Sequence, residues 1–485
     1  MPIKFGTDGW RAIIDEDFSN ENVKLVSGAI AKYYQDQNFH SIVIGFDGRR
    51  KADVFAKLTA EVMAGSDIKV YLVDKPCPTP TAAFSILAKN ANGGIMFTAS
   101  HNPPEFLGLK YMMEDSSGAP DAVTGQFIKS LDGLKTDRIK TMPFEEAKKE
   151  GLIEIFNPKP SYFGALRKVV DLEKIKNAEL KVLYNTMHGS GAGYLGEILA
   201  GGKIQIDPIN ETIDPNFGGV PPEPVLEKNI GDAIEKMSAK GGSASGGRQE
   251  GYDVCLIADG DADRVGAVDE NGKMITSHEV FLLLAYYLIK IKGERGPIVG
   301  SITHTVMVRN LCQKYGLPYF ETPVGFKWIG EKMKETGAIL GSEESGGSAI
   351  PGFILVRDSQ LVHLLILSLL IEIGKSISEI IKIAKAEAGG EFTYRREDVH
   401  FEYEGFEEIK NVKGKELVQN PPKEVLGRKV VKTRTDDGLK LFFADGTWLL
   451  IRFSGTEPIL RLMAEAKTKK EAEALISYAK EYFGK

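Results

Sequence analysis

Short apolar runs rich in β-branched residues alternate with helix-like runs through most of this chain, and this alternation limits the fold more than any other feature. Residues 41–46, with the sequence SIVIGF, form the clearest strand. A helix over residues 52–64 and a further strand over residues 69–73 follow it. Strands that alternate with helices in this way predict layered α/β units whose strands pair mostly in parallel.

The alternation starts again twice. Apolar strands at residues 180–184 and 253–258 indicate a second unit. Strands at residues 297–302 and 338–340 indicate a third, with helices over residues 279–291 and 359–373. A chain of 485 residues is long enough for several domains. We therefore expect three consecutive α/β units of similar size.

The pattern changes from about residue 389 onward. Strand-like runs separated by turns lie at residues 392–394, 429–433, 439–443 and 447–453. Thr468 and Glu471 have the spacing of a capping box, which predicts that a closing helix begins there. This segment is typical of an α+β domain. We place the domain boundaries at residues 1–150, 151–270, 271–388 and 389–485.

The charge balance excludes one large class of function. Lys and Arg total 61 and Asp and Glu total 67, so the net charge is −6. A dedicated nucleic-acid binder usually has a basic excess, so we expect no nucleic-acid partner. An anionic small molecule is still compatible with this charge, because a local cluster of Arg and Lys can oppose the overall sign.

The cysteines and the apolar runs indicate the cellular compartment of the protein. Cys77, Cys255 and Cys312 lie far apart, without the spacing of a zinc or redox motif. The longest apolar stretches, residues 281–291 and 361–373, are too short to span a bilayer. The first residues, MPIKFGTDGW, contain no apolar signal core. We therefore expect a cytoplasmic protein with no membrane partner.

The segment TASHNPPE, residues 98–105, follows an apolar strand predicted at residues 94–97. It should lie at the carboxyl end of that strand, where open α/β sheets bind ligands. Small and turn-forming neighbours expose the hydroxyl of Ser100, and His101 is adjacent, so Ser100 is a candidate nucleophile. Taken alone, the segment slightly favours a plain turn stabilised by Asn102 and the prolines.

The segment DGDADR also follows a strand, and its Asp259, Asp261 and Asp263 can converge on one hard cation. An EF-hand loop is the main alternative, because Glu270 falls at the twelfth position of such a loop. Arg264, however, stands where the turn glycine belongs, and a strand precedes the loop instead of a helix. We therefore favour Mg²⁺ shared between the protein and a phosphate.

Further segments carry weaker signals. Residues 341–347, GSEESGG, offer carboxylate and hydroxyl groups that suit sugar hydroxyls, although such loops are usually just solvated. Residues 452–458, RFSGTEP, combine a guanidinium, hydroxyls and backbone N–H groups that can bind a phosphate; an ordinary turn is the alternative, although a turn would not need this combination. Residues 5–11, FGTDGWR, place Arg11 near the N-terminus, where it is either a phosphate partner or a surface arginine.

Together and in this order, these five segments resemble the α-D-phosphohexomutase family. The resemblance runs from FGTDGWR to RFSGTEP and so covers nearly the whole chain, and TASHNP and DGDADR are specific signatures. It implies three related α/β domains with mixed sheets and a C-terminal α+β domain around a central cleft. Each domain would contribute one loop to that cleft.

The resemblance also implies roles for individual residues. Ser100 would be the phosphoserine, and a phosphoserine oxygen would join Asp259, Asp261 and Asp263 as a ligand of Mg²⁺. Lys110 and His101 would be candidates for acid–base work at the reacting phosphate. The other residues implied near the reacting phosphate, the sugar and the distal phosphate are Arg11, Arg264, Lys327, Glu343, Ser345, Arg452, Ser454, Gly455 and Thr456.

The activity implied is a phosphosugar mutase that interconverts hexose 1-phosphate and hexose 6-phosphate, with glucose 1,6-bisphosphate as activator and intermediate. Ser345 is followed by two glycines, where many mannose and glucosamine enzymes have a His at the second of these positions. Residues 323–328, PVGFKW, have the phosphoglucomutase-like form. Both features favour glucose, with mannose phosphates as an alternative. Ser359 stands where the family often has Gly, after Arg357 and Asp358, and we expect little consequence.

Two other functions remain open on the residues alone. A metal-dependent phosphatase with a phosphoserine intermediate would not need the RFSGTEP loop. A non-catalytic sugar-phosphate binder would be expected to have lost Ser100 or part of the aspartate triad, and this chain retains both. Hexose phosphates are the expected partners, and the chain is expected to be a monomer or a homodimer.

Overall fold

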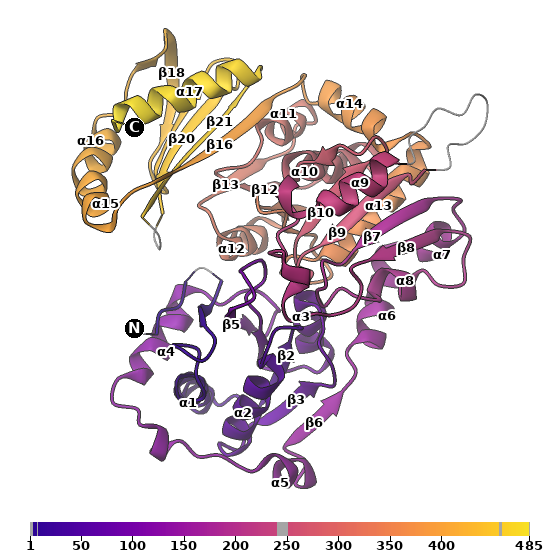
Figure 1. Cartoon of the computed structure of the whole chain (residues 1–485), viewed down its shortest axis with the longest axis vertical. Coiled ribbons are helices and arrows are strands. Elements are labelled where there is room, and N and C mark those ends of the chain that lie inside the picture. The colour runs from indigo at the N-terminus through magenta and orange to yellow at the C-terminus, as the bar shows by residue number, and fades with distance from the viewer. Residues whose placement is uncertain (1–2, 7, 240–250, 455–457, 485) are drawn as a thin grey trace.

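The computed structural model describes the whole chain except residues 1–2, 7, 240–250, 455–457 and 485. The described part contains four β-sheets that follow one another along the sequence (Figure 1). In three of them parallel and antiparallel pairs are mixed, and in the fourth all pairs are antiparallel. This arrangement confirms the predicted fold class of α/β units followed by an α+β unit.

The first sheet has the strand order β1-β5-β4-β2-β3-β6. Strands β2, β3, β4 and β6 pair in parallel, and β5 runs antiparallel to β4 and β1. The strands are β1 (Trp10–Ile13), β2 (Ser41–Phe46), β3 (Lys69–Val73), β4 (Gly93–Phe97), β5 (Phe106–Met113) and β6 (Ile153–Phe156). The helices are α1 (Asn20–Gln37), α2 (Ala52–Ala64), α3 (Thr79–Ala88), α4 (Asp121–Leu131) and α5 (Phe144–Lys149).

The second sheet has the order β11-β10-β9-β7-β8. Its strands are β7 (Lys181–Asn185), β8 (Gln205–Ile209), β9 (Val254–Ala258), β10 (Val265–Asp269) and β11 (Met274–Ile275). Its helices are α6 (Lys159–Val169), α7 (Leu172–Lys176), α8 (Tyr194–Ile198) and α9 (Gly231–Ala239). The turn between β9 and β10 is the DGDADR segment, so the aspartates lie at the end of a central, buried strand.

The third sheet has the order β13-β12-β14-β15. Its strands are β12 (Ile298–Ser301), β13 (Tyr319–Thr322), β14 (Leu340–Ser342) and β15 (Ser348–Ala349). Its helices are α10 (Ser277–Tyr286), α11 (Val306–Lys314), α12 (Phe326–Thr336), α13 (Ser359–Ile373) and α14 (Ile377–Glu387). The GSEESGG segment connects β14 to β15, so its residues lie at the carboxyl end of a parallel strand.

The fourth sheet is antiparallel in the order β16-β21-β20-β19-β18-β17, and α17 packs on it (Figure 1). The strands are β16 (Thr393–His400), β17 (Glu424–Val425), β18 (Arg428–Arg434), β19 (Leu439–Phe443), β20 (Trp448–Phe453) and β21 (Ile459–Ala466). The helices are α15 (Tyr403–Ile409), α16 (Lys415–Gln419) and α17 (Lys469–Tyr482). Thr468 and Glu471 form the predicted capping box.

The apolar helix α13 belongs to two units at once. It follows the third sheet in sequence, but it also packs against β9 and β10 of the second sheet. His363 of α13 contacts the main-chain oxygen of Ile257 in β9, at 3.2 Å. The second and third units therefore share one continuous core, which explains why this helix is apolar on nearly all its faces.

Sheet membership bears on where the domains divide. Strand β6 lies beyond residue 150 but pairs with β3 of the first sheet, and β11 lies beyond residue 270 but pairs with β10 of the second. We therefore propose four domains as predicted, but with the end of the first domain moved from residue 150 to beyond Phe156 and the end of the second moved from residue 270 to beyond Ile275. No helix among the described residues is long and apolar enough to cross a membrane.

Most strong apolar patterns gave the right elements, and the differences have physical causes. The bounds of β2, α2, β3, β19 and α13 are those predicted. The helix predicted over residues 279–291 begins two residues earlier, and its last turn, Tyr287–Ile291, is π-helical. The strand predicted at residues 338–340 is Leu340–Ser342, because pairing with β12 and β15 carries it into the glycine-rich loop.

A buried hydrogen bond joins the second unit to the start of α13. The hydroxyl of Tyr162 in α6 donates to both carboxylate oxygens of Asp358, at 2.8 and 2.9 Å. Asp358 is the N-cap of α13 and accepts a further hydrogen bond from the backbone N–H of Leu361. Burial raises the pKa of Asp358 to about 6, which reflects how little solvent reaches this carboxyl. The bond therefore fixes the segment that immediately follows Arg357.

We expect Tyr162→Phe to lower the free energy of unfolding by about 1–3 kcal/mol, because the buried Asp358 loses a donor that water cannot replace. Urea denaturation at neutral pH measures this difference. Tyr482→Phe, which removes a hydroxyl from a partly exposed tyrosine, is the control and should change stability by less than about 0.5 kcal/mol. Equal stabilities of the Tyr162→Phe and wild-type proteins would contradict this role.

Candidate active site

Ser100 lies in the loop between β4 and β5, directly against the aspartate turn of the second unit. Its side chain is fully buried, and its Oγ donates a hydrogen bond to Oδ2 of Asp259 at 2.8 Å. Its backbone has a φ of 52°, in the left-handed region that non-glycine residues rarely adopt. The backbone N–H of Ser100 donates to Oγ1 of Thr98 at 2.8 Å, which helps to hold this turn. The predicted serine and metal segments therefore meet across two sheets.

The three aspartates of the DGDADR turn form one compact group. One oxygen from each of Asp259, Asp261 and Asp263 lies within 4.8 Å of the others, and all three residues are buried. Burial and the neighbouring carboxylates raise the pKa of Asp259 well above its usual value. For Asp261, burial is outweighed by Lys110 and Thr79, so its pKa lies below the usual range. Like charges this close require positive charge among them.

The donor set fits a hard divalent cation. Oδ1 of Asp261 and Oδ1 of Asp263 are buried and lack a hydrogen-bond partner among the residues that the structure describes. Carboxylate oxygens are the ligands that Mg²⁺ and Ca²⁺ prefer. Glu270, the twelfth residue of a hypothetical EF-hand loop, instead accepts hydrogen bonds from the hydroxyl and backbone N–H of Ser378. The calcium-loop alternative therefore lacks its bidentate ligand.

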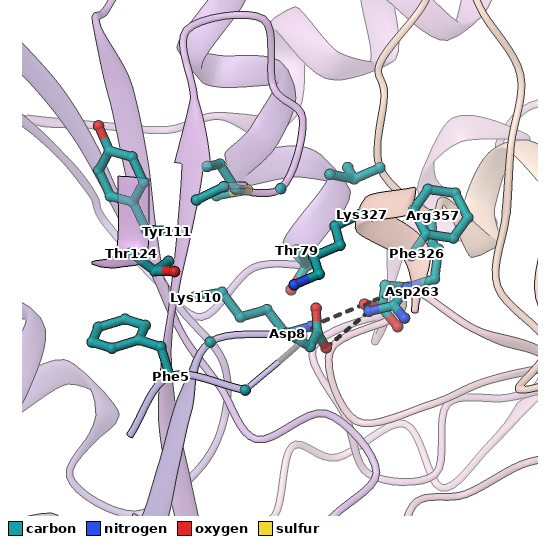
Figure 2. Close-up of a pocket in the computed structure, with 16 residues that line it drawn as sticks. Phe5, Asp8, Thr79, Lys110, Tyr111, Thr124, Asp263, Phe326, Lys327 and Arg357 are labelled. Atoms are coloured by element: carbon teal, nitrogen blue, oxygen red, sulfur yellow. Dashed lines mark hydrogen bonds and ion pairs between the residues drawn. The ribbon is translucent and has the colours of Figure 1, made fainter. Parts of the chain in front are cut away.

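Two buried cations balance the aspartate group. Nζ of Lys110, on β5, lies 2.9 Å from Asp261 and 3.0 Å from Asp263. Arg357 donates to Asp263 from Nη2 at 2.7 Å and to Asp8 from the same nitrogen at 3.0 Å. Figure 2 shows Lys110 and Arg357 on opposite sides of Asp8. Burial would lower the pKa of Lys110, but the aspartates outweigh it and hold that pKa above its usual value.

The remaining residues predicted around the reacting phosphate also lie here. Arg11 donates to Asn102 of the serine loop at 2.5 Å and to Asp8 at 2.6 Å. Nε of Arg264 lies 3.9 Å from Asp259. Burial, together with Arg264 and Arg11, lowers the pKa of His101 well below its usual value. At neutral pH the site thus combines a neutral imidazole with a protonated Lys110.

Arg357 also connects this cluster to residues 341–347, GSEESGG, which we call the sugar loop. Arg357 pairs with Glu343, and the hydroxyl of Ser345 donates to the same carboxylate oxygen at 2.5 Å. Burial would raise the pKa of Glu343, but Arg357 outweighs it and keeps the carboxylate ionised. Lys327, at the start of α12, directs its Nζ to Asp121 of the first unit, at 2.5 Å. Lys327 thus contacts the first unit directly, and Glu343 is connected to it through Arg357, which also donates to Asp8.

A small pocket of about 50 Å³ lies beside the cluster (Figure 2). Lys110 and Asp8 line it from the first unit, Asp263 from the second, and Lys327 and Arg357 from the third. Apolar and aromatic side chains also line it, among them Phe5, Tyr111, Met112, Phe326 and Val356. Three units thus meet at one solvent-accessible, charged site.

The described residues of the predicted phosphate loop RFSGTEP belong to the fourth unit. Nε of Arg452, near the end of β20, donates to Oδ1 of Asp437 at 2.7 Å, and Ser454 is buried. Oδ2 of Asp437 accepts from the backbone N–H of Val324, in the segment that leads to Lys327, at 2.8 Å. Gly455 and Thr456 lie outside the described residues. Asp437 thus connects the base of this loop to the third unit.

Sequence reasoning missed several residues of the site. Asp8 is part of the FGTDGWR segment, where only Arg11 was singled out. Thr79 donates its hydroxyl to Asp261 at 2.6 Å, and its proline-rich surroundings gave only the signal of a helix start. Arg357 gave a stronger signal, since it precedes an N-cap aspartate and follows the sugar loop by ten residues.

Comparison with known families agrees with this geometry. Models of the phosphoglucomutase/phosphomannomutase α/β/α domains I, II and III match residues 2–136, 160–272 and 276–386, respectively. The model of the C-terminal domain of the same family matches residues 408–479. The fold is that of a phosphomutase. The chain belongs to the α-D-phosphohexomutase family.

Relatives match over nearly the full length. A phosphoglucomutase/phosphomannomutase of Thermococcus kodakarensis is 29% identical over 96% of this chain and 95% of its own length. A phosphoglucosamine/phosphogalactosamine mutase of Sulfurisphaera tokodaii is 27% identical over 98% of both chains. The crystal structure of a candidate phosphomannomutase from Thermus thermophilus covers 99% of both chains, with 29% identity and a TM-score of 0.84.

We expect Mg²⁺ to raise the melting temperature of the wild-type protein, because an ion that binds only the folded state adds about 2.7 kcal/mol at a hundred times its dissociation constant. Asp261→Asn should largely abolish this shift. Glu270→Gln, which alters the twelfth position of the calcium-loop alternative, should leave it intact. Thermal melting with and without Mg²⁺ checks all three. Loss of the shift in Glu270→Gln but not in Asp261→Asn would overturn the assignment.

Proposed function

We propose that this protein is a phosphosugar mutase that interconverts hexose 1-phosphate and hexose 6-phosphate, with Ser100 as the phosphoryl carrier. The observation that carries the proposal is the 2.8 Å hydrogen bond between Ser100 and Asp259. It brings a candidate nucleophile to a group of carboxylates that fits Mg²⁺. Arg357 then links that group to Glu343 of the sugar loop.

In the proposed reaction, phosphorylated Ser100 gives its phosphoryl group to the free hydroxyl of a hexose monophosphate. The bond between Oγ and phosphorus breaks, a bond from the sugar oxygen to phosphorus forms, and the hydroxyl proton passes to a base. The product is a hexose 1,6-bisphosphate, such as glucose 1,6-bisphosphate. This intermediate reorients in the site so that its other phosphoryl group faces Ser100. That group is then transferred back to Ser100, and the proton returns to the sugar oxygen.

The residues around Ser100 suit this transfer. Arg11, Arg264 and Lys110 supply positive charge beside the carrier, which stabilises the charge on a transferring phosphoryl group. A bound Mg²⁺ would add to that charge neutralisation. Neutral His101 can accept the hydroxyl proton, and protonated Lys110 can donate one, so both remain candidates for acid–base work.

The substrate contacts are proposed in two places. Glu343 and Ser345 would bind the sugar hydroxyls, with Lys327 beside them. Arg452 and Ser454, with Gly455 and Thr456, would hold the phosphate that does not react. A phosphatase would not require this second anchor, which is the reason to prefer a mutase.

We propose glucose phosphates as the preferred substrates and mannose phosphates as an alternative. The sugar loop ends in two glycines, and no His in it can contact the sugar. The relatives described above include glucose, mannose and glucosamine enzymes by name, so substrate preference must be measured directly.

We expect the purified protein, with Mg²⁺ and a trace of glucose 1,6-bisphosphate, to convert glucose 1-phosphate to glucose 6-phosphate. Ser100→Ala should reduce this rate by at least about 10³-fold, because the phosphoryl carrier is gone. Phosphorus NMR with glucose, mannose and glucosamine 1-phosphates in turn gives the order of preference. Release of inorganic phosphate in place of isomerisation would favour a phosphatase instead.

We expect Asp437→Ala to raise the KM for the hexose phosphate by about 10-fold with a smaller change in kcat, because Arg452 loses a charge-assisted hydrogen bond. Asp436→Ala is the matched control, since its carboxylate pairs with Arg434 at the same turn. Steady-state kinetics of both variants checks the expectation. Equal KM values in the two variants would exclude a role of Asp437 in the phosphate anchor.

A further inference from the structure

Arg49 follows β2 and is almost completely buried, yet most of its hydrogen bonds go to main-chain oxygens of a single loop. Its Nη2 donates to the carbonyl oxygens of Ser100 and Asn102, at 2.7 and 2.6 Å. Its Nη1 donates to the carbonyl oxygens of Pro103 and Phe106, at 2.8 and 2.9 Å. One guanidinium group thus binds three carbonyls of the loop that carries the candidate nucleophile and one carbonyl of the first residue of β5.

This loop needs such support. Between β4 and β5 it contains neither helix nor strand. Main-chain N–H groups bind the carbonyls of Ala99, Pro103 and Glu105, whereas Arg49 binds those of Ser100 and Asn102. Ser100 adopts the left-handed conformation, which costs a non-glycine residue about 1–2 kcal/mol. A strained residue persists only where its surroundings determine its conformation fully. The four hydrogen bonds from Arg49 help to fix the backbone conformation of Ser100 and its neighbours.

Arg49 is itself held from both sides. Its Nε lies 3.4 Å from Oδ2 of buried Asp47, and its guanidinium lies 4.7 Å from the ring centre of Phe217 in the second unit. On the same side, a Cβ at Gly260 would lie only 2.9 Å from the carbonyl oxygen of Ser100. The backbone of the serine loop is therefore enclosed between the guanidinium and the aspartate turn.

We propose that Arg49 is a positioning residue that sets the geometry of Ser100 toward Asp259 during phosphoryl transfer. The inference rests on the proposed function, in which Ser100 carries the phosphoryl group. Arg49 does not contact the hydroxyl of Ser100 and acts only through the backbone. A planar fork with five donors can bind four carbonyls at once, whereas the single ammonium group of lysine cannot.

The decisive variants are Arg49→Lys and Arg49→Ala, compared with Arg50→Ala in the full-length protein. Arg50 is exposed and pairs with Asp15, so its loss removes a neighbouring positive charge without touching the loop. We expect kcat to fall by about 10²-fold in both Arg49 variants, since a displacement of about 1 Å costs that much, while KM changes by less than about 3-fold. Arg50→Ala should stay within about 2-fold of the wild type.

Chemical rescue separates positioning from a general loss of folding. Guanidinium at millimolar concentration should raise the kcat of Arg49→Ala by about 10-fold or more, because it can occupy the vacated site and donate to the same carbonyls. It should not rescue Ser100→Ala. A kcat within 3-fold of the wild type in Arg49→Lys and Arg49→Ala would overturn the proposal, as would the absence of rescue in folded Arg49→Ala.

Hydrogen exchange distinguishes this inference from the proposed function. If the wild-type protein isomerises no sugar phosphate, the proposed function fails, yet peptides covering residues 98–106 should still exchange faster in Arg49→Lys than in Arg50→Ala. Equal exchange in these two variants would overturn the positioning role whatever the activity. If Arg49→Ala fails to fold, Arg49→Lys carries both the kinetic and the exchange test.

Discussion

Asp259, Asp261 and Asp263 are held in the interior beside one another, and this concentration of negative charge governs much of what surrounds it. A buried carboxylate is costly unless it is paired and hydrogen-bonded, so each must find positive charge or donors nearby. The structure supplies Lys110 from the first unit and Arg357 from the third. The polar interior of one unit is therefore satisfied only when three units come together.

The same requirement explains how the units are joined. The second and third share a core through α13, whose start is fixed by the bond between Tyr162 and Asp358. Arg357 immediately precedes that start, so apolar packing sets where its guanidinium lies. The first unit has a core of its own, and it meets the others through apolar contacts of α3, where Phe84 stacks on Phe353, and through polar groups such as Ser100 and Lys110. Apolar packing thus positions Arg357, and ion pairs and hydrogen bonds join the first unit to the aspartate turn.

The sequence revealed those parts of the site whose chemistry is concentrated in one short segment. Ser100 and the aspartates follow apolar strands, so both the strand end and the functional group could be predicted locally. The 2.8 Å contact between Ser100 and Asp259 could not, because it joins two sheets about 160 residues apart in sequence. Arg49 was missed for a related reason: a single arginine after a strand gives no local sign that its partners are carbonyl groups. Strand β16 was predicted too short because most of its residues are polar and partly or fully exposed.

The C-terminal unit contacts the third unit at the sugar loop and at the segment that leads to Lys327. Glu344, next to Glu343, accepts a hydrogen bond from the hydroxyl of Tyr394 at 3.1 Å. Asp437 holds both Arg452 and the backbone of Val324. The segments proposed to bind the sugar and the distal phosphate are therefore connected by hydrogen bonds between the third and fourth units. A displacement of the fourth sheet would act on both at once, so the two ends of a substrate would be gripped or released together.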